Sequence, residues 1–198
     1  MDSTTPCYSE RVDDALAFVA HAFRMKLRKG TGTPYLAHLL AVSALVAEHG
    51  GDEDQIVAAL LHDTLEDIDG VTADDIERRF SARVAAFVVA LSDTTTRPKP
   101  PWEERKRRYL AHLRSEPAEL KLISAADKLH NARSLVRDYL QVGDALWDRF
   151  TASKEQTLWY YEAVLGALVD GWEHPILGEL ELTVRELLDI AGGEFNRD

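Results

Sequence analysis

The stretch HDTLED concentrates residue types that bind metals or move protons. His62 and Asp63 are adjacent, Glu66 follows His62 by four residues, and Asp67 follows Asp63 by four. If one helix runs through this stretch, the four side chains share one of its faces. Three carboxylates and an imidazole directly after an apolar turn are costly to bury without a compensating cation. The spacing therefore indicates a metal site, and the alternative is a helix end that turns polar toward water.

Two other segments carry residues of the same kinds. His38 lies in the apolar segment GTPYLAHLLAV, and Asp127 follows a run of small or apolar residues in LISAADKLHNARSL. Asn131 and Ser134 come four and seven residues after Asp127, so a helix places all three on one stripe. Each residue also has an ordinary structural interpretation. A lone histidine on an apolar helix face is most often a core residue, and an aspartate there usually pairs with a neighbouring Lys or Arg.

Taken together, His38, His62, Asp63 and Asp127 offer two imidazole nitrogens and two carboxylates. This donor set suits Mn²⁺, Fe²⁺, Co²⁺ or Zn²⁺ better than Mg²⁺ or Ca²⁺. Four protein ligands leave room for water, which favours a catalytic site over a sealed structural one. Such a water would attack phosphorus in a phosphoester or pyrophosphate. Glu66 and Asp67 would exchange its proton, and their acid and base roles stay open at this point.

The charge balance restricts the partners. The chain has 23 Lys+Arg against 34 Asp+Glu, a formal net charge of −11, so it should repel nucleic acids and polyphosphates unless cations cluster. For Arg24 and Lys26, a phosphate contact and a place in the basic C-terminal turn of a helix are equally natural. Arg28 and Lys29 come later, in a glycine-containing loop that could wrap a phosphate. We therefore expect a small anionic ligand, with no nucleic-acid partner and no membrane partner.

Helical periodicity dominates the elements that must position these residues, and no long strand pattern occurs. Apolar residues make up 45% of the 198 residues, which is typical of a globular chain. We predict one all-α domain over 1–198, a bundle of eight to ten helices.

The individual elements follow from caps and breaks. The expected N-caps are Asp52, Thr72 with Asp75, and Ser81, and an expected loop spans Ser92–Pro101. The expected helices are an N-terminal one with the stripe Val12 to Phe23, closed by Arg28–Pro34, then Tyr35–His49, Asp54–Asp67, Ala73–Phe80, 82–91, Trp102–Arg114, Pro117 to about Leu140, about Ala145–Trp172, and Glu179–Ile190.

Three features bear on the compartment. The longest apolar run, Val84–Leu91, is far shorter than the roughly 20 residues that span a bilayer. The N-terminus is polar and acidic, unlike a signal peptide. Cys7 is the only cysteine, so neither an intrachain disulfide nor a thiolate zinc cluster is possible. We expect a cytoplasmic protein.

The pattern His…His-Asp…Asp resembles the signature of the HD-domain metal-dependent phosphohydrolases, an all-helical superfamily. The segments RKGTGTPYLAH, LLHDTLED and ADKLHNARSL are similar to motifs of the RelA/SpoT-type alarmone hydrolases. This resemblance covers roughly residues 10–170, and about 171–198 would be a C-terminal helical extension. No synthetase or regulatory region is present in the sequence, so the chain looks like a stand-alone small alarmone hydrolase, similar to the metazoan SpoT homologues.

The resemblance implies a role for each matching residue. The four matching metal ligands are His38, His62, Asp63 and Asp127, and the usual metal of the family is manganese. Glu66 and Asp67 match the pair that acts in the hydrolysis step. The residues that match nucleotide contacts are Arg28, Lys29, Asn131 and Ser134, the last with a hydroxyl where many members have threonine. Leu39 departs from the proline that often follows the first ligand, and the base-contacting residues near the last long helix are not identified.

The activity that the resemblance implies is Mn²⁺-dependent hydrolysis of (p)ppGpp, (p)ppApp or both, releasing the 3′-pyrophosphate, as in the stringent response. One alternative is a general HD nucleotide phosphatase that acts on nucleoside monophosphates or NADPH. Another is a non-catalytic HD module that senses nucleotides or binds a protein, although such degenerate domains normally lose a ligand or the Glu-Asp pair. The expected partner of the hydrolase is a small nucleotide polyphosphate.

Overall fold

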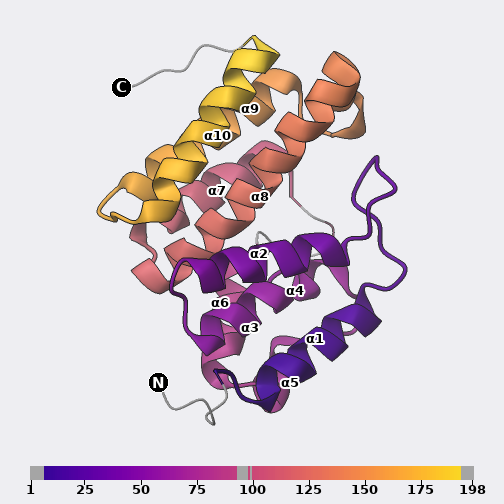
Figure 1. The fold of residues 1–198 in the computed structure, drawn as a ribbon, viewed down its shortest axis with the longest axis vertical. Coiled ribbons are helices and arrows are strands. Elements are labelled where there is room, and N and C mark those ends of the chain that lie inside the picture. The colour runs from indigo at the N-terminus through magenta and orange to yellow at the C-terminus, as the bar shows by residue number, and fades with distance from the viewer. Residues whose placement is uncertain (1–6, 93–97, 99, 193–198) are drawn as a thin grey trace. The chain divides into compact units, whose positions relative to one another are not determined.

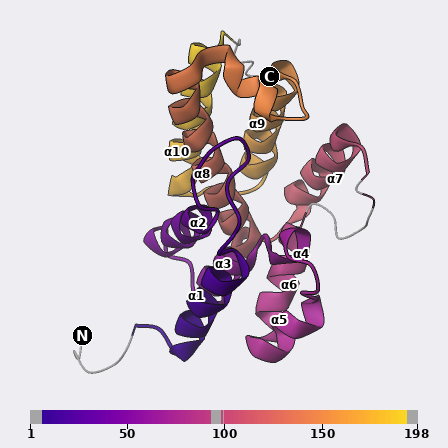
Figure 2. The same ribbon diagram turned by 90° about the vertical axis from the view of Figure 1, so that its right-hand side faces the viewer.

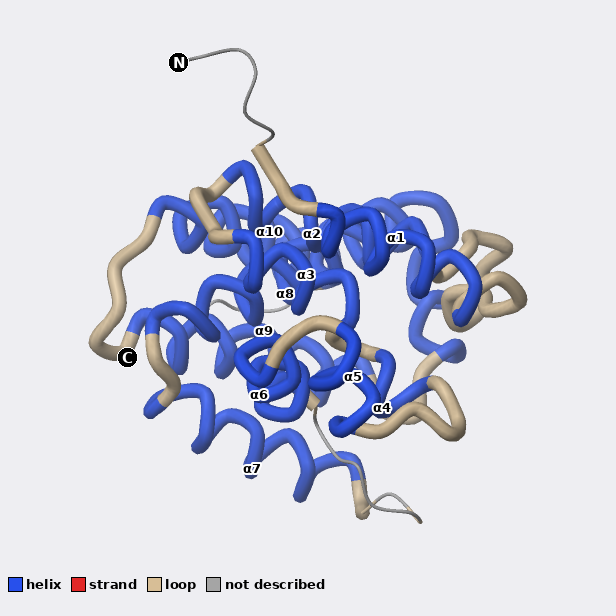
Figure 3. The backbone as a smooth tube through the Cα atoms, turned by 90° about the horizontal axis from the view of Figure 1, so that it is seen from below, coloured by secondary structure: helices blue, strands red, loops and turns tan. Residues whose placement is uncertain are grey.

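The computed structural model describes residues 7–92, 98 and 100–192, and within them the regular structure is helical (Figure 3). The helices there are α1 to α10 and one 3₁₀ helix, η1, and the only pairing of β type is an isolated bridge between Leu27 and Pro34. The predicted all-α fold is confirmed. No helix among these residues combines the length and apolarity needed to cross a membrane. Most of the predicted loop Ser92–Pro101 lies outside the described residues.

The chain divides into two compact units. Unit 1 comprises Met1–Arg28 and Gly32–Ser92, and unit 2 comprises Lys29–Thr31 and Asp93–Asp198. Residues 29–31 of the glycine-containing loop therefore belong to unit 2, although the chain on both sides of them belongs to unit 1. The single domain expected over 1–198 stays a prediction.

Unit 1 is built around a buried central helix, α3. The helices of this unit are α1 (Glu10–Ala22), α2 (Leu36–Glu48), α3 (Glu53–Leu61), α4 (Thr64–Asp67), α5 (Ala73–Arg79) and α6 (Ala82–Leu91). Helix α3 packs against α1, α2 and α6, and α5 packs against α6 (Figure 1). The side chains from Ile56 to Leu61 are at most 4% exposed. Burial on all sides explains why IVAALL carries no polar face.

The predicted N-caps of this unit are confirmed. The Asp52 carboxylate accepts from the backbone amide of Gln55 at 3.0 Å, and the side-chain oxygen of Gln55 accepts from the backbone amide of Asp52 at 2.8 Å, which is a capping box. Thr72 and Asp75 form the same arrangement at α5, and Ser81 caps α6. Because these bonds satisfy amides that no helix can pair internally, they determine where α3, α5 and α6 begin.

One predicted helix of unit 1 is wrong. The stretch from Asp54 to Asp67 was expected to form a single helix with four functional side chains on one face, but α3 ends at Leu61 and α4 starts at Thr64. The hydroxyl of Thr64 donates to the Leu61 carbonyl at 2.6 Å, a side-chain bond that competes with the helical pattern. His62 and Asp63 therefore lie at a junction between two helices.

The predicted end of the first helix is also wrong. Helix α1 stops at Ala22, and Phe23 turns inward to stack on Tyr35, with 5.3 Å between the ring centroids. Arg24 and Lys26 therefore lie beyond the helix and do not form its C-terminal turn. The chain then folds back on itself, since the amide of Arg28 donates to the Thr33 carbonyl at 2.9 Å.

Unit 2 is a set of packed helices in which α8 contacts both α9 and α10, and α7 packs on α9 (Figure 2). Ile123, Leu129, Leu168 and Leu180 are fully buried among them. The elements are α7 (Trp102–Ser115), α8 (Ala118–Val142), η1 (Gly143–Arg149), α9 (Lys154–Val169) and α10 (Pro175–Ala191).

Three predictions fail in unit 2. The helix expected over about Ala145–Trp172 is two elements, η1 and α9, because Ser153 forms a capping box with Gln156 and starts a new helix. The sequence SKEQ carries this signal. Pro117 is the N-cap of α8 rather than part of its first turn. Helix α10 begins at Pro175, four residues before the expected start, because the ring of proline suits the first helical position.

Candidate functional site

His62 is oriented by the end of α3. Its Nδ1 lies 2.8 Å from the Ala59 carbonyl, which can only accept, so Nδ1 carries a proton. The other ring nitrogen, Nε2, lies 3.1 Å from Oδ2 of Asp63. The side chain of His62 is buried. A neutral imidazole whose other nitrogen is held by a backbone carbonyl is the usual form of a metal-binding histidine.

His38 and Asp63 lie beside this ring in unit 1. His38 is buried on α2, its ring contacts that of His62 edge to face at 5.2 Å, and its Nε2 is 3.6 Å from Oδ2 of Asp63. The same carboxylate oxygen accepts from the hydroxyl of Tyr35 at 2.7 Å. The three predicted ligands of unit 1 are therefore neighbours, even though the helical face expected to unite His62 and Asp63 does not exist.

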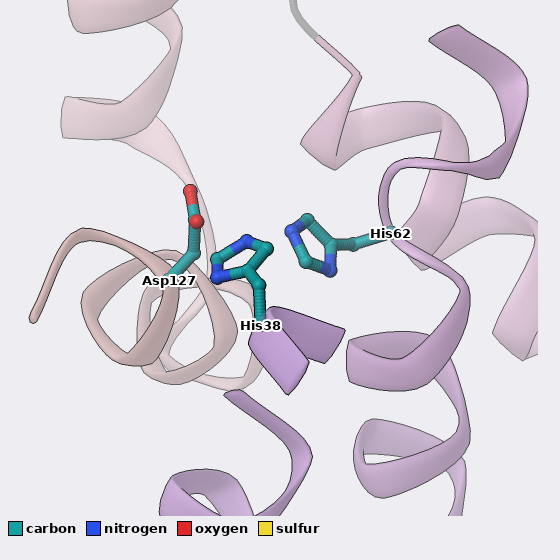
Figure 4. A group of neighbouring side chains, drawn as sticks. All are labelled: His38, His62 and Asp127. Atoms are coloured by element: carbon teal, nitrogen blue, oxygen red, sulfur yellow. The ribbon is translucent and has the colours of Figure 1, made fainter. Parts of the chain in front are cut away.

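The donors of unit 1 fit a divalent transition metal. Two imidazole nitrogens face one carboxylate oxygen at 3.1 and 3.6 Å, and the other ring nitrogen of His62 is held by the Ala59 carbonyl. Imidazole together with carboxylate is a donor set for Mn²⁺, Fe²⁺, Co²⁺ or Zn²⁺. Figure 4 draws three of the predicted ligands, all of them buried: His38 and His62 of unit 1, and Asp127.

Asp127 belongs to unit 2, on α8. Its Oδ1 accepts from the Asn131 amide at 2.5 Å, one helical turn away, and its Oδ2 accepts from Lys128 Nζ at 2.5 Å. The predicted stripe of Asp127 and Asn131 is therefore real, and so is the ion pair with a neighbouring lysine that was its structural alternative. The hydroxyl of Ser134 donates to the His130 carbonyl at 2.9 Å, so its proton is used within the helix.

The predicted catalytic pair lies in the short helix α4. Glu66 and Asp67 are both half-buried. Asp67 forms an ion pair with Lys26, with 2.8 Å between Oδ2 and Nζ, and the ammonium of Lys26 lies 5.2 Å from the ring centre of Tyr35. The sequence left two roles open for Lys26, a phosphate contact or the basic end of a helix, and neither is a partner for Asp67. Lys26 lies 41 residues before Asp67 in the chain, and no local signal connects the two.

Part of the basic loop is held against unit 2. Lys29 Nζ lies 3.5 Å from the Thr151 hydroxyl, and the guanidinium of Arg149 pairs with Asp138 at 3.4 Å. Gly30 has φ +70°, and a Cβ placed on it would lie 2.5 Å from Cδ of Arg149. Glycine is therefore required at this position for both its backbone conformation and its space. Arg28 and Lys29 remain predicted phosphate contacts.

Sequence reasoning missed Tyr35 and Lys128 as parts of the site. Tyr35 occurs in the quoted motif PYLAH, three residues before His38, and Lys128 directly follows Asp127 in DKLHN. Both donate a hydrogen bond to a predicted metal ligand, at 2.7 Å and 2.5 Å. The sequence signal that could have identified both residues is that each lies inside a motif that also contains a predicted ligand. Tyr160 and Tyr161 of α9 are buried, at 6% and 7% exposed.

Comparisons with known proteins agree with these motifs. The HD domain family model matches residues 15–157. The guanosine-3′,5′-bis(diphosphate) 3′-pyrophosphohydrolase MESH1 of Mus musculus is 40% identical over 127 residues, 63% of this chain and 69% of the mouse protein. The protein of the same name in Homo sapiens is 39% identical over 127 residues, which are again 63% of this chain and 69% of the human protein. A guanosine-3′,5′-bis(diphosphate) 3′-pyrophosphohydrolase of Aquifex aeolicus is 35% identical over 66% of this chain and 18% of that longer protein.

A solved structure extends the similarity to nearly the whole chain. It is described as a metazoan ortholog of SpoT that hydrolyzes ppGpp and plays a role in starvation responses. The match has a TM-score of 0.74 and 28% identity, and it covers 96% of this chain and 99% of the other. Since the family model spans most of the chain and the mouse relative is 40% identical, the chain belongs to the HD-domain family, in its RelA/SpoT-type alarmone hydrolase branch.

Proposed function

We propose that the protein is a metal-dependent hydrolase that removes the 3′-pyrophosphate from guanosine 3′,5′-bis(diphosphate)-type alarmones. The observation that carries this proposal is the grouping of His38, His62 and Asp63 in unit 1, in a chain whose relatives are named for this reaction. The substrate class includes (p)ppGpp and its adenosine counterpart (p)ppApp. The net charge of −11 supports a small nucleotide over a nucleic acid.

The metal is Mn²⁺, held by His38, His62 and Asp63 with Asp127 as the fourth ligand. The choice of these residues is supported by their donor chemistry, by the burial of three of them, and by their match to the family signature. A divalent ion bound there neutralises charge on phosphoryl oxygens and makes water more acidic. This supplies the positive charge that an acidic protein otherwise lacks near a polyphosphate.

The remaining residues bind the substrate and move the proton. Glu66 and Asp67 take a proton from the attacking water and return one to the leaving ribose oxygen, and Lys26 holds the carboxylate of Asp67 at 2.8 Å. Arg28 and Lys29 contact the phosphates. Asn131 and Ser134 contact the nucleotide, Asn131 from beside Asp127. We place the protein in the cytoplasm, consistent with the single, exposed cysteine Cys7.

Product analysis tests this function directly. The Mn²⁺-loaded protein is incubated separately with ppGpp, ppApp, GMP and NADPH, and the products are separated by ion-exchange chromatography. Release of pyrophosphate with GDP from ppGpp supports the proposal, because only attack at the 3′ position yields both. Orthophosphate from GMP or NADPH, with ppGpp intact, contradicts it and indicates a general nucleotide phosphatase.

Ligand variants test the metal site. Asp63→Ala and Asp127→Ala should each lose turnover and bound manganese together, because each removes a proposed ligand. Asp74→Ala is the matched control, since Asp74 is an exposed carboxylate in the first turn of α5. A folded Asp63→Ala protein with full activity would refute the site.

A further inference from the structure

Lys128 is a cation with little exposure to solvent, and it touches a proposed metal ligand. Its side chain is 14% exposed, and its ammonium donates to Oδ2 of Asp127 at 2.5 Å. The other carboxylate oxygen, Oδ1, accepts from Asn131 at 2.5 Å. The two bonds come from opposite ends of the carboxylate, so together they restrict its rotation. A carboxylate oxygen has two acceptor positions, so one hydrogen bond to it does not by itself prevent metal binding.

Two tyrosine rings from neighbouring helices hold this ammonium. It lies 5.0 Å from the ring centre of Tyr109 on α7 and 6.0 Å from that of Tyr160 on α9. Tyr109 is itself fixed by a hydrogen bond from its hydroxyl to Ser124 at 3.1 Å. Tyr160 is buried, and its ring meets that of Trp102 edge to face at 6.0 Å. We call Tyr109 and Tyr160 the tyrosine pair.

The charge of Lys128 is stabilised where it lies. Its ammonium lies against the carboxylate of Asp127 and beside both rings of the tyrosine pair. Ring faces attract a cation through their quadrupole, and this attraction is stronger away from water. Asp127 and the two rings therefore all attract the ammonium of Lys128.

We propose that Lys128 is a positioning residue, which the tyrosine pair holds in place so that it orients the carboxylate of Asp127 for metal binding. This role rests on the proposed metal site. Partners that orient a metal ligand typically change metal affinity or activity by about 10- to 100-fold when they are removed. The geometry thus connects α7 and α9, which carry no proposed ligand, to the ligand on α8.

The direction in which Lys128→Met changes the Mn²⁺ affinity distinguishes a positioning role of Lys128 from a purely electrostatic one. If Lys128 acted on the metal only through its charge, Lys128→Met would tighten Mn²⁺ binding, because it removes a cation near the metal. If Lys128 positions Asp127, the same variant should weaken Mn²⁺ binding by about 10- to 100-fold. Lys128→Arg should restore part of the affinity, because it keeps a donor between the two rings.

The experiment measures Mn²⁺ affinity by isothermal titration calorimetry on the full chain, with kcat and KM for ppGpp recorded alongside. Lys106→Met is the matched control, since Lys106 of α7 is also a lysine beside the ring of Tyr160, at 4.9 Å from its centre, yet has no role in the proposed site. The control should bind Mn²⁺ as the wild type does. Unchanged or tighter Mn²⁺ binding by folded Lys128→Met overturns the positioning role.

A second pair of variants covers the case in which Lys128→Met does not fold. Tyr160→Leu removes one ring from the tyrosine pair and should weaken Mn²⁺ binding, whereas Tyr160→Phe keeps the ring and should not. Equal affinities in these two variants overturn the proposal. If the wild type binds Mn²⁺ but does not hydrolyse ppGpp, the proposed substrate fails, and the affinities still decide the role of Lys128.

Discussion

Tyr35 is the residue that connects the core of unit 1 to the predicted ligands. Its ring stacks on Phe23 at 5.3 Å and meets the ring of His38 edge to face at 5.6 Å, while its hydroxyl donates to Asp63 at 2.7 Å. One side chain thus restricts both a histidine and a carboxylate. Hydrogen-bond partners of metal ligands fix the ligand's orientation, so Tyr35 should affect catalysis more than stability.

We predict that Tyr35→Phe lowers kcat/KM for ppGpp by about 10- to 100-fold, because the ring stays and only the bond to Asp63 is lost. The free energy of unfolding should fall by no more than about 1.5 kcal/mol, the usual contribution of one hydrogen bond. Steady-state kinetics and urea denaturation measure the two effects. Tyr139→Phe is the matched control. It removes a hydrogen bond of 3.1 Å from a tyrosine hydroxyl to an aspartate, Asp144, that has no role in the proposed site. Equal activity losses in both variants would contradict the role of Tyr35.

At the scale of elements, the N-cap of α3 stabilises the helix whose other end carries His62. Asp52 caps this helix, and Arg83 of α6 pairs with it at 2.8 Å. Burial alone would raise the pKa of Asp52, but the Gln55 amide and Arg83 together lower it below the usual value of 3.8. A lowered pKa means that the ionised cap stabilises the fold at neutral pH.

We predict that Asp52→Ala costs about 1 kcal/mol of unfolding free energy at pH 7 and leaves kcat unchanged, because the cap lies at the far end of α3 from His62. The difference in stability between Asp52→Ala and wild type should be complete above pH 3.8 and shrink as the pH falls below it, since the ionised form is lost there. Chemical denaturation across acidic pH measures this. Asp52→Asn, which keeps an acceptor without the charge, should remove most of the pH dependence.

The glycine-containing loop is a second element with a testable requirement. Gly30→Ala should raise KM for ppGpp, because a Cβ with φ +70° would meet Arg149 at 2.5 Å and displace Lys29 next to it. The left-handed backbone adds a cost of about 1 to 2 kcal/mol to the fold. Gly32→Ala is the control, since a Cβ there meets nothing within 4 Å and its backbone is ordinary. A similar KM in both variants would argue against a phosphate-binding role for this loop.

At the scale of the whole molecule, metal binding should stabilise the fold. A ligand present at 100 times its dissociation constant adds about 2.7 kcal/mol, which for a chain of this size raises Tm by about 5 to 10 °C. We predict this shift when Mn²⁺ is added to chelator-treated protein, as measured by calorimetry. His62→Ala in unit 1 and Asp127→Ala in unit 2 should each abolish it, because the proposed ligands come from both units.

His112→Ala is the control for that shift. His112 lies on α7, is exposed, and pairs with Glu116 at 2.8 Å, so its loss should leave the response to Mn²⁺ intact. If Asp127→Ala responds to Mn²⁺ as the wild type does, the ligand set is confined to unit 1.

The sequence by itself determined the helical class, the N-caps at Asp52, Thr72 and Ser81, and the family. These signals are local. A cap depends on residues three positions apart, an amphipathic stripe on one turn of helix, and a motif on a few neighbouring residues. The same locality explains how the bond between Asp127 and Asn131, four residues apart on one helix, could be anticipated.

Only the tertiary structure decided how the site residues contact one another. Tyr35 and Asp63 are 28 residues apart and Lys26 and Asp67 are 41 apart, so no local pattern predicts either pair. The helix break after Leu61 depends on a Thr64 hydroxyl that could equally have faced solvent. The surroundings of Lys128 depend on how α7 and α9 pack beside α8. Such contacts arise when buried polar groups must find partners as helices pack, and the sequence order alone does not specify those partners.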